Sequence, residues 1–363
     1  MKLVVTQENL NHALNVVGRV ASAKTTLPVL NNILLKTDNN RLLLAATNLE
    51  VAITEHIGAR VSSEGSITVP ARLFAEFISN LPKTNVELKL DGTKLHIKAD
   101  KFTSTINGMA AEEFPALPEL ESGSRLSQPA NEFKRAVSQT ALTASKDDTR
   151  PVLTGVLLHS FEGKLYLAAT DGYRLSEKVL SETKEEIYAL IPATALNDVV
   201  RVMPDDLDKI DILLDDSQVK FRIGEIELTS RLIDGKLPDY RQLIPSKTDN
   251  QASLSTDEFS RITKIASLFA RESGGSVTIK TSPDDSTVSI DSIASQQGES
   301  SSAASAEVTG EGQITLNSRY LIEALGCIDD DSLSFGFSGK LAPCVLKPAG
   351  SDDYQHIIMP LKS

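Results

Sequence analysis

The chain contains the same residue pattern twice, about 120 positions apart, and this repetition limits the folds it can adopt. Pro28–Leu35 reads PVLNNILL and Pro151–Leu158 reads PVLTGVLL, at an offset of 123 positions. The same offset relates LLLAAT at Leu42–Thr47 to LYLAAT at Leu165–Thr170. It also relates Phe114-Pro115 to Leu237-Pro238. Three matches at one offset indicate a duplicated unit.

A third, weaker copy follows the first two. Leu10, Phe133 and Phe259 occupy one helical position at steps of 123 and 126, and Pro70, Pro192 and Asn317 occupy another at steps of 122 and 125. Solenoid repeats are 20 to 50 residues long, so units of this length are expected to be domains with their own cores. The chain is interpreted as a tandem triplication.

Two polar stretches, Glu119–Gln128 and Ser246–Ser253, have the composition of linkers between these copies. They predict three domains, at residues 1–121, 128–246 and 252–363. Each copy shows apolar residues at helical spacing at its start and again in its middle. Short segments of alternating polarity lie between, such as the hairpin Val86–Leu90 and Lys94–Lys98 around Asp91-Gly92-Thr93. The fold class expected is α+β, with two helices on an antiparallel sheet in each domain.

The net charge of −12 argues against a protein that grips nucleic acid over its whole surface, because phosphate binding depends on Lys and Arg. Positive charge is nevertheless concentrated in the first helical stretch of each copy. Across Gln7–Lys24, Asn131–Lys146 and Thr256–Arg271, basic residues exceed acidic ones by four, which leaves −16 for the rest. Complementation of the helix dipole is the alternative explanation for one such helix.

Each second helix carries an arginine and an acid, and the three acids occupy the same repeat position. The arginines are Arg72, Arg201 and Arg319, and the acids are Glu76, Asp198 and Glu323. The acids are interpreted as a solvated edge.

No motif for catalysis, a cofactor or a metal is found. GxxxxGKS/T, HExxH and Gly-rich dinucleotide turns are absent, and the five histidines lack ligand spacing. The pair Asp147-Asp148 is interpreted as a turn rather than an acid/base pair, because neighbouring side chains on a strand point apart. Cys327 and Cys344 are expected to be structural. The N-terminus lacks a signal sequence and no long apolar run occurs, so a cytoplasmic protein is expected.

Five motifs together resemble the bacterial DNA polymerase III beta subunit family, and the likeness spans the whole chain. They are TLPVL at Thr26–Leu30, TVPAR at Thr68–Arg72, ATDGYRL at Ala169–Leu175, DGKLPDY at Asp234–Tyr240 and MPL at Met359–Leu361. The resemblance implies a non-enzymatic DNA sliding clamp. In that family, three-domain chains form head-to-tail homodimers that close a ring around duplex DNA, with helices inside and sheets outside. A ring held by topology needs only a weak, sequence-independent attraction to phosphate.

The resemblance also implies three sets of site residues. DNA contacts are expected at Lys24, Arg72, Lys146 and Arg150. The dimer interface is expected to join the strand region of Phe102 and Ile106 to the helix region of Ser267 and Leu268.

The third set forms an apolar cleft for short linear motifs of the DNA polymerase III alpha subunit, the clamp loader and repair polymerases. Its expected residues are Leu153, Thr170, Gly172, Tyr173, Arg174, Leu175, Pro238, Leu243, Tyr320, Leu341, Pro343, Met359, Pro360 and Leu361. Gln242 and Tyr173 stand where some relatives carry Arg and His, so the resemblance does not fix the motif preference.

Two other hypotheses fit fewer features of the sequence. A monomeric three-domain interaction platform without DNA would share the fold, and a hydrolase using a carboxylate pair would need a site that no motif indicates. The Ser/Gln-rich segment Ser295–Ser302 is interpreted as a mobile loop.

Overall fold

The computed structural model describes residues 1–21, 27–294 and 298–361. The chain divides into two compact units. Unit 1 comprises Met1–Asn131 and Thr194–Leu232, and unit 2 comprises Glu132–Ala193 and Ile233–Ser363. Each unit is described below by itself.

All six predicted helices form. They are α1 (Gln7–Val17), α2 (Ala71–Ser79), α3 (Ala130–Thr140), α4 (Ala193–Val202), α5 (Thr256–Phe269) and α6 (Ser318–Leu325). Polar side chains begin three of them: Thr6, Ser255 and Asn317 each accept a hydrogen bond from a backbone N–H of the first turn. Helix α1 ends at Val17, short of the basic end of its predicted stretch.

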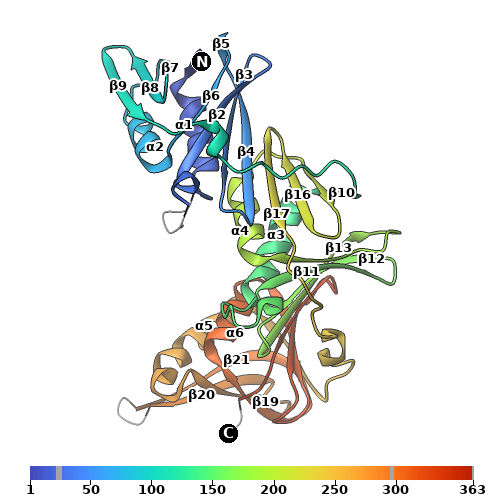
Figure 1. The fold of residues 1–363 in the computed structure, drawn as a ribbon. Coiled ribbons are helices and arrows are strands. Elements are labelled where there is room, and N and C mark those ends of the chain that lie inside the picture. The colour runs from blue at the N-terminus through green and yellow to red at the C-terminus, as the bar shows by residue number, and fades with distance from the viewer. Residues whose placement is uncertain (22–26, 295–297, 362–363) are drawn as a thin grey trace. The chain divides into compact units, whose positions relative to one another are not determined.

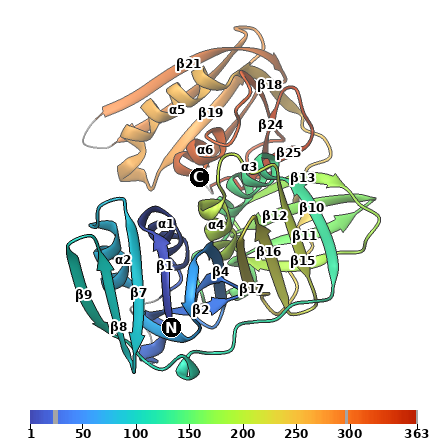
Figure 2. The ribbon, with the colours of Figure 1, turned by 90° about the horizontal axis from the view of Figure 1, so that it is seen from above.

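Unit 1 contains two antiparallel sheets. The first has the order β5-β1-β7-β8-β9, in which β9 is an edge strand (Figure 2). The second has the order β10-β15-β16-β17-β4-β3-β2-β6, and α1 packs against β3, β4 and α2 (Figure 1). The strands are β1 (Lys2–Thr6), β2 (Asn32–Asp38), β3 (Arg41–Thr47), β4 (Val51–Gly58), β5 (Arg60–Ser63), β6 (Ser66–Pro70), β7 (Asn85–Asp91), β8 (Lys94–Ala99), β9 (Phe102–Asn107), β10 (Ser124–Pro129), β15 (Lys209–Leu214), β16 (Gln218–Ile223) and β17 (Ile226–Arg231). The predicted hairpin is confirmed as β7 and β8.

Unit 2 contains one sheet of twelve strands, in the order β14-β11-β12-β13-β25-β24-β23-β18-β21-β20-β19-β22. Its strands are β11 (Gly155–Phe161), β12 (Lys164–Thr170), β13 (Arg174–Glu182), β14 (Tyr188–Pro192), β18 (Asn250–Ser255), β19 (Ser276–Ser282), β20 (Thr287–Ala294), β21 (Gly298–Thr309), β22 (Gly312–Asn317), β23 (Ser332–Phe337), β24 (Cys344–Pro348) and β25 (Tyr354–Ile358). Within this unit α5 packs along β21 and against α6 (Figure 2).

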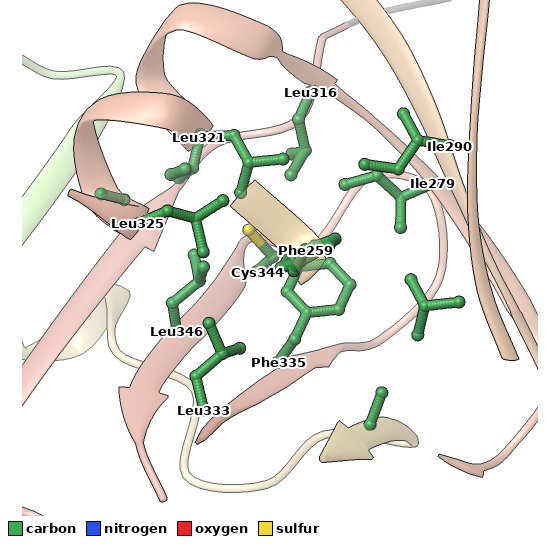
Figure 3. Packing of buried hydrophobic residues seen from close by; sticks show 14 of the residues in the cluster. Phe259, Ile279, Ile290, Leu316, Leu321, Leu325, Leu333, Phe335, Cys344 and Leu346 are labelled. Carbon is green, nitrogen blue, oxygen red and sulfur yellow. The ribbon is translucent and has the colours of Figure 1, made fainter. Parts of the chain in front are cut away.

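The core of the third repeat follows from its apolar pattern. Figure 3 shows Leu321 and Leu325 of α6 directed toward Phe259 of α5 and toward Cys344 and Phe335 on the sheet. Phe259 and Phe335 are fully buried with ring centroids 5.6 Å apart. Burial of such side chains contributes roughly 2–3 kcal/mol each, so the helix pair and the sheet stabilise each other.

Three repeats give two units because the strands of the middle repeat are divided between sheets. Strand β17 of that repeat pairs with β4 of the first, with Leu228 opposite Ile53. Strand β13 pairs with β25 of the third, with Leu175 opposite Ile357. Each unit therefore has a sheet that continues from one repeat to the next, which leaves fewer strand edges unpaired. The domain limits 1–121, 128–246 and 252–363 stay a prediction.

The prediction of a loop at Ser295–Ser302 is wrong for residues 298–302. Residues 298–302 belong to β21, where Ser300–Ser302 pair with Asp291–Ser292 and Ile290 of β20. Serine is tolerated there because a strand exposed on one face needs apolar residues only at alternate positions, such as buried Ala304. Ser295–Gln297 lie outside the described residues.

Candidate peptide-binding cleft and DNA-facing surface

The loop Thr170–Arg174, between β12 and β13, is fixed by its own side chains. Thr170 Oγ1 donates to the Arg174 carbonyl at 2.6 Å. Asp171 Oδ1 accepts from the backbone N–H groups of Tyr173 and Arg174 at 2.9 and 3.0 Å. Gly172 has φ of 91°, a left-handed conformation that favours glycine. The sequence TDGYR therefore forms a rigid turn that exposes Tyr173.

The C-terminal segment lies along this turn. Strand β25 pairs with β13, and directly after it Met359 N–H donates to the Tyr173 carbonyl at 2.8 Å. Two residues later, Leu361 N–H donates to the Thr315 carbonyl of β22 at 2.8 Å. The sheet register thus brings the two predicted motifs, ATDGYRL and MPL, side by side.

Arg174 connects the turn to α6 of the third repeat. Its guanidinium donates to Asp171 at 3.1 Å, to the Leu142 carbonyl at 2.8 Å and to Glu323, and it lies 4.5 Å from the ring centroid of Tyr320. The residue is 8% exposed. Burial alone would raise the pKa of Glu323, but hydrogen bonds from Arg174 and Arg319 outweigh it and lower that pKa. Arg174 therefore fixes the turn to α6 rather than presenting a free cation.

The remaining predicted cleft residues divide into members of a buried apolar cluster and exposed or half-buried apolar side chains. Leu175 is buried and Leu153 half-buried in one cluster with Leu237 and Tyr240. Tyr173 is 61% exposed, Leu243 48% and Leu341 77%. Pro238 is exposed, and Pro343, Met359, Pro360 and Leu361 are half-buried. Exposed apolar side chains beside a preformed turn suit capture of an extended peptide.

A polar network that the sequence analysis missed holds the segment leading to Leu243. Buried Tyr240 donates to Glu177 and lies 2.6 Å from His159 Nε2. Arg241 Nη2 lies 3.0 Å from Glu177 Oε2, and Arg241 Cζ lies 4.0 Å from the centroid of the Phe161 ring. Burial, followed by the negative charge of Glu177, raises the pKa of Tyr240, so this phenol stays protonated and donating. The only signal in the sequence was the position of Tyr240 at the end of the DGKLPDY motif.

The predicted DNA contacts are exposed where the structure describes them. Arg72 lies in the first turn of α2, and its side chain is 92% exposed and paired to Glu76 at 2.9 Å. Lys146 is exposed, and Arg150 Nε lies 3.6 Å from Asp147 Oδ2. Arg150 Nη1 also lies 3.7 Å from where a Cβ on residue 172 would stand, so it borders the peptide turn. Lys24 lies outside the described residues.

The three acids of the second helices were interpreted as a solvated edge, and the structure corrects this because each acid forms an ion pair. Each pairs with the arginine of its own helix: Glu76 with Arg72, Asp198 with Arg201 at 3.5 Å, and Glu323 with Arg319 at 2.9 Å. Such i,i+3 and i,i+4 pairs on a helix surface contribute a few tenths of a kcal/mol. Glu323 differs because it also accepts from Arg174, which fixes α6 to the turn.

The predicted interface residues differ in exposure. Phe102 on edge strand β9 is 42% exposed and Leu268 on α5 is 51% exposed. Ser267 is half-buried, and its hydroxyl donates to the Lys264 carbonyl. Ile106 is only 4% exposed in the single chain, because it faces the core of the first repeat.

The acidic pair and the two cysteines considered in the sequence lie in the part of the chain that the structure describes. No group of three or more His, Cys, Asp or Glu residues there could hold a metal ion. Asp147 accepts from Thr149 in a turn, as predicted. Cys327 and Cys344 are free thiols, and burial raises their pKa to about 11 and about 12, which keeps them unreactive. Among these residues no helix is long and apolar enough to cross a membrane.

Comparison with solved structures defines the class of protein. The chain is similar over its whole length to a DNA polymerase sliding clamp from Bacillus subtilis, with a TM-score of 0.96, 26% identity and 99% of that chain covered. It is also similar to the DNA polymerase III subunit beta from Pseudomonas aeruginosa, with a TM-score of 0.95, 26% identity and both chains covered completely. The fold is that of a three-domain DNA sliding clamp.

The family follows from sequence comparison. Three family models match in order: the DNA polymerase III beta subunit N-terminal domain at residues 1–118, its central domain at 127–239 and its C-terminal domain at 241–362. A curated relative, the beta sliding clamp of Staphylococcus aureus, is 30% identical with both chains covered completely. The chain belongs to the DNA polymerase III beta subunit family, which confirms the resemblance seen in the sequence.

Proposed function

We propose that two copies of this chain associate head to tail into a ring around duplex DNA and tether DNA polymerase to it, without catalytic activity of their own. The full-length match of all three domains to beta sliding clamps carries this proposal. The domain limits proposed are 1–121, 128–246 and 252–363. A cytoplasmic location follows from a role at replicating DNA.

Unpaired strand edges support the head-to-tail association. Strand β9 pairs only with β8, and the Gly298–Ser305 part of β21 pairs only with β20 among the described strands. Exposed apolar residues accompany both edges, with Phe102 on β9 and Ile265 and Leu268 on α5, which packs along β21. Pairing of β9 with β21 of a second chain would satisfy both edges. Two such contacts, each between unlike surfaces, close a ring when each chain spans half of it.

Segregated charge supports DNA as the enclosed partner. Arg72, Lys146 and Arg150, with Lys24, are the proposed phosphate contacts, and the first three are exposed. An enclosing ring is retained by topology, so a few contacts to phosphate allow sliding without base recognition. The acidic total of −12 repels DNA from the remaining surface.

The cleft around Tyr173 is the proposed attachment point for partners. It would take short linear motifs of the DNA polymerase III alpha subunit, the clamp loader and repair polymerases. Apolar rims with few polar anchors accept several related peptides, and Met359 suits such a site because its side chain adapts to different ligands.

Two matched substitutions test the proposal. The mass in solution reports the dimer, and the affinity for a polymerase peptide reports the cleft. Leu268→Asp should convert a dimer of about twice 39.2 kDa into a monomer while leaving polymerase-peptide binding unchanged. Leu341→Asp, at a leucine of the proposed cleft that is also exposed, should abolish peptide binding and leave the dimer intact. A wild-type mass of 39.2 kDa at micromolar concentration would instead favour a monomeric interaction platform.

A further inference from the structure

A pocket borders the turn of the first repeat that is equivalent to the turn Thr170–Arg174 of the second, and strands β16 and β17 of the second repeat complete it. The pocket measures about 370 Å³ and lies entirely within unit 1. Its lining comes from the turn between β3 and β4, from Pro115, Ala116 and Pro118, and from Gln218 and Arg231 on β16 and β17. Pro115 is the repeat equivalent of the cleft residue Pro238.

The turn that lines this pocket repeats the hydrogen bonds of the cleft turn. Thr47 Oγ1 donates to the Val51 carbonyl at 2.9 Å, as Thr170 does to Arg174. Asn48 Oδ1 accepts from the backbone N–H groups two and three residues later, at 3.0 and 2.7 Å, as Asp171 does. The backbone arrangement is therefore retained in both repeats.

The side chains on the two turns differ. Leu49 stands in place of Gly172, and Val51 stands in place of Arg174. Leu49 adopts φ of 76°, a left-handed conformation that strains any residue with a Cβ, and its side chain is 50% exposed. A strained leucine that remains exposed at a pocket wall indicates a contact surface rather than a packing requirement.

Two polar groups in the pocket lack partners. Gln218 Oε1 is buried and accepts no hydrogen bond from any residue that the structure describes. The guanidinium of Arg231 is exposed and has no acceptor within the described ranges. The arginine of the cleft turn, in contrast, is satisfied by Asp171 and Glu323. The pocket therefore offers an acceptor and a cation to a ligand.

We infer that this pocket binds a short extended peptide in which a leucine adjoins a glutamate. The leucine packs on Leu49 and Pro115, the glutamate carboxylate pairs with Arg231, and a peptide N–H donates to Gln218 Oε1. A volume near 370 Å³ is at the small end of ligand pockets, so two or three peptide residues fill it. Exposed Glu50 on the rim adds a negative charge, which selects peptides with a single acid. This goes beyond the proposed function and requires neither a ring nor DNA.

Photo-crosslinking tests the inference on the full-length protein. The probe is acetyl-Leu-Glu-Leu-amide with photo-leucine at its first position, and the comparison probe carries Gln for Glu. All measurements use the Leu341→Asp background, in which the second-repeat cleft is disabled. Crosslinks mapped by mass spectrometry should fall on 47–52 or 115–118. Arg231→Gln should lower the yield with the Glu probe about two- to fivefold, as expected for one solvent-accessible ion pair.

The matched control is Arg222→Gln, an exposed arginine on neighbouring β16 that pairs with Glu227 and does not line the pocket. It should leave the yield unchanged, and the Gln probe should be insensitive to Arg231→Gln. Crosslinks confined to unit 2, or equal losses in both arginine variants, would overturn the inference. A monomeric mass with crosslinks still at 47–52 would reject the clamp proposal and leave this one standing.

Discussion

Replacement of Arg174 by alanine should destabilise unit 2 by about 3 kcal/mol. The side chain is 8% exposed and donates to Asp171, to Glu323 and to the Leu142 carbonyl. Breaking a buried ion pair costs about 3–5 kcal/mol. Glu323 retains 32% side-chain exposure and can be rehydrated, which favours the lower end. For a unit of roughly 150–250 residues this corresponds to a loss of about 6–12 °C in Tm.

Differential scanning calorimetry on the variant measures this loss, and Arg319→Ala is the control. Arg319 donates to the same Glu323 at 2.9 Å, but its side chain is 72% exposed, so its removal should cost less than about 1 kcal/mol. Arg174→Ala should also abolish binding of a fluorescent polymerase peptide, since the Tyr320 ring loses its stacking partner. Equal shifts in Tm for the two variants would refute the role assigned to Arg174.

Three further predictions follow from the same contacts. Tyr240→Phe should lower the free energy of unfolding by about 1–3 kcal/mol in urea, because buried Glu177 and His159 lose a shared partner; no change would contradict this. Burial raises the pKa of Glu55 from 4.5 to about 7, so unit 1 should lose up to about 3 kcal/mol of stability as pH rises through that range, and Glu55→Gln should remove the slope. Deletion of Met359–Ser363 should weaken polymerase-peptide binding while the dimer mass persists, and unchanged affinity would reject the cleft.

Much of the fold could be predicted because the sequence repeats. A pattern that recurs at one offset indicates a structural unit even where the helix or strand propensity of single residues is weak. Six helices and the β7–β8 hairpin followed from apolar spacing, and the offset of 123 placed the two equivalent turns. The sharing of the middle repeat between two sheets was not predicted. The pairing of Leu228 with Ile53 joins strands of different repeats. The alternation of polar and apolar residues shows which face of a strand is buried, but it does not show which strand lies beside it.

The sequence named the segments of the candidate site, and the structure brings two of them, ATDGYRL and MPL, together, but the contacts that hold them were not predicted. Tyr173 and Leu341 are exposed apolar rims, as a binding surface requires. Arg174, in contrast, is buried and donates to Glu323, which lies 149 positions away along the chain. The residues around Arg174 in the sequence give no indication of that partner. Tyr240 similarly depends on His159 and Glu177 from two other strands. The polar partners of these residues come from distant parts of the chain and are brought together by the packing of the strands and helices. A single sequence does not show that packing.

Retention on DNA of different topology tests the central claim most directly. The protein is loaded onto nicked circular DNA by a clamp loader, separated from free protein by gel filtration, and the DNA is then cut once. Because a closed ring is held by geometry rather than adhesion, the protein should remain on the circle and leave the linear DNA by sliding off its ends. Equal retention on circular and linear DNA would contradict the enclosing ring.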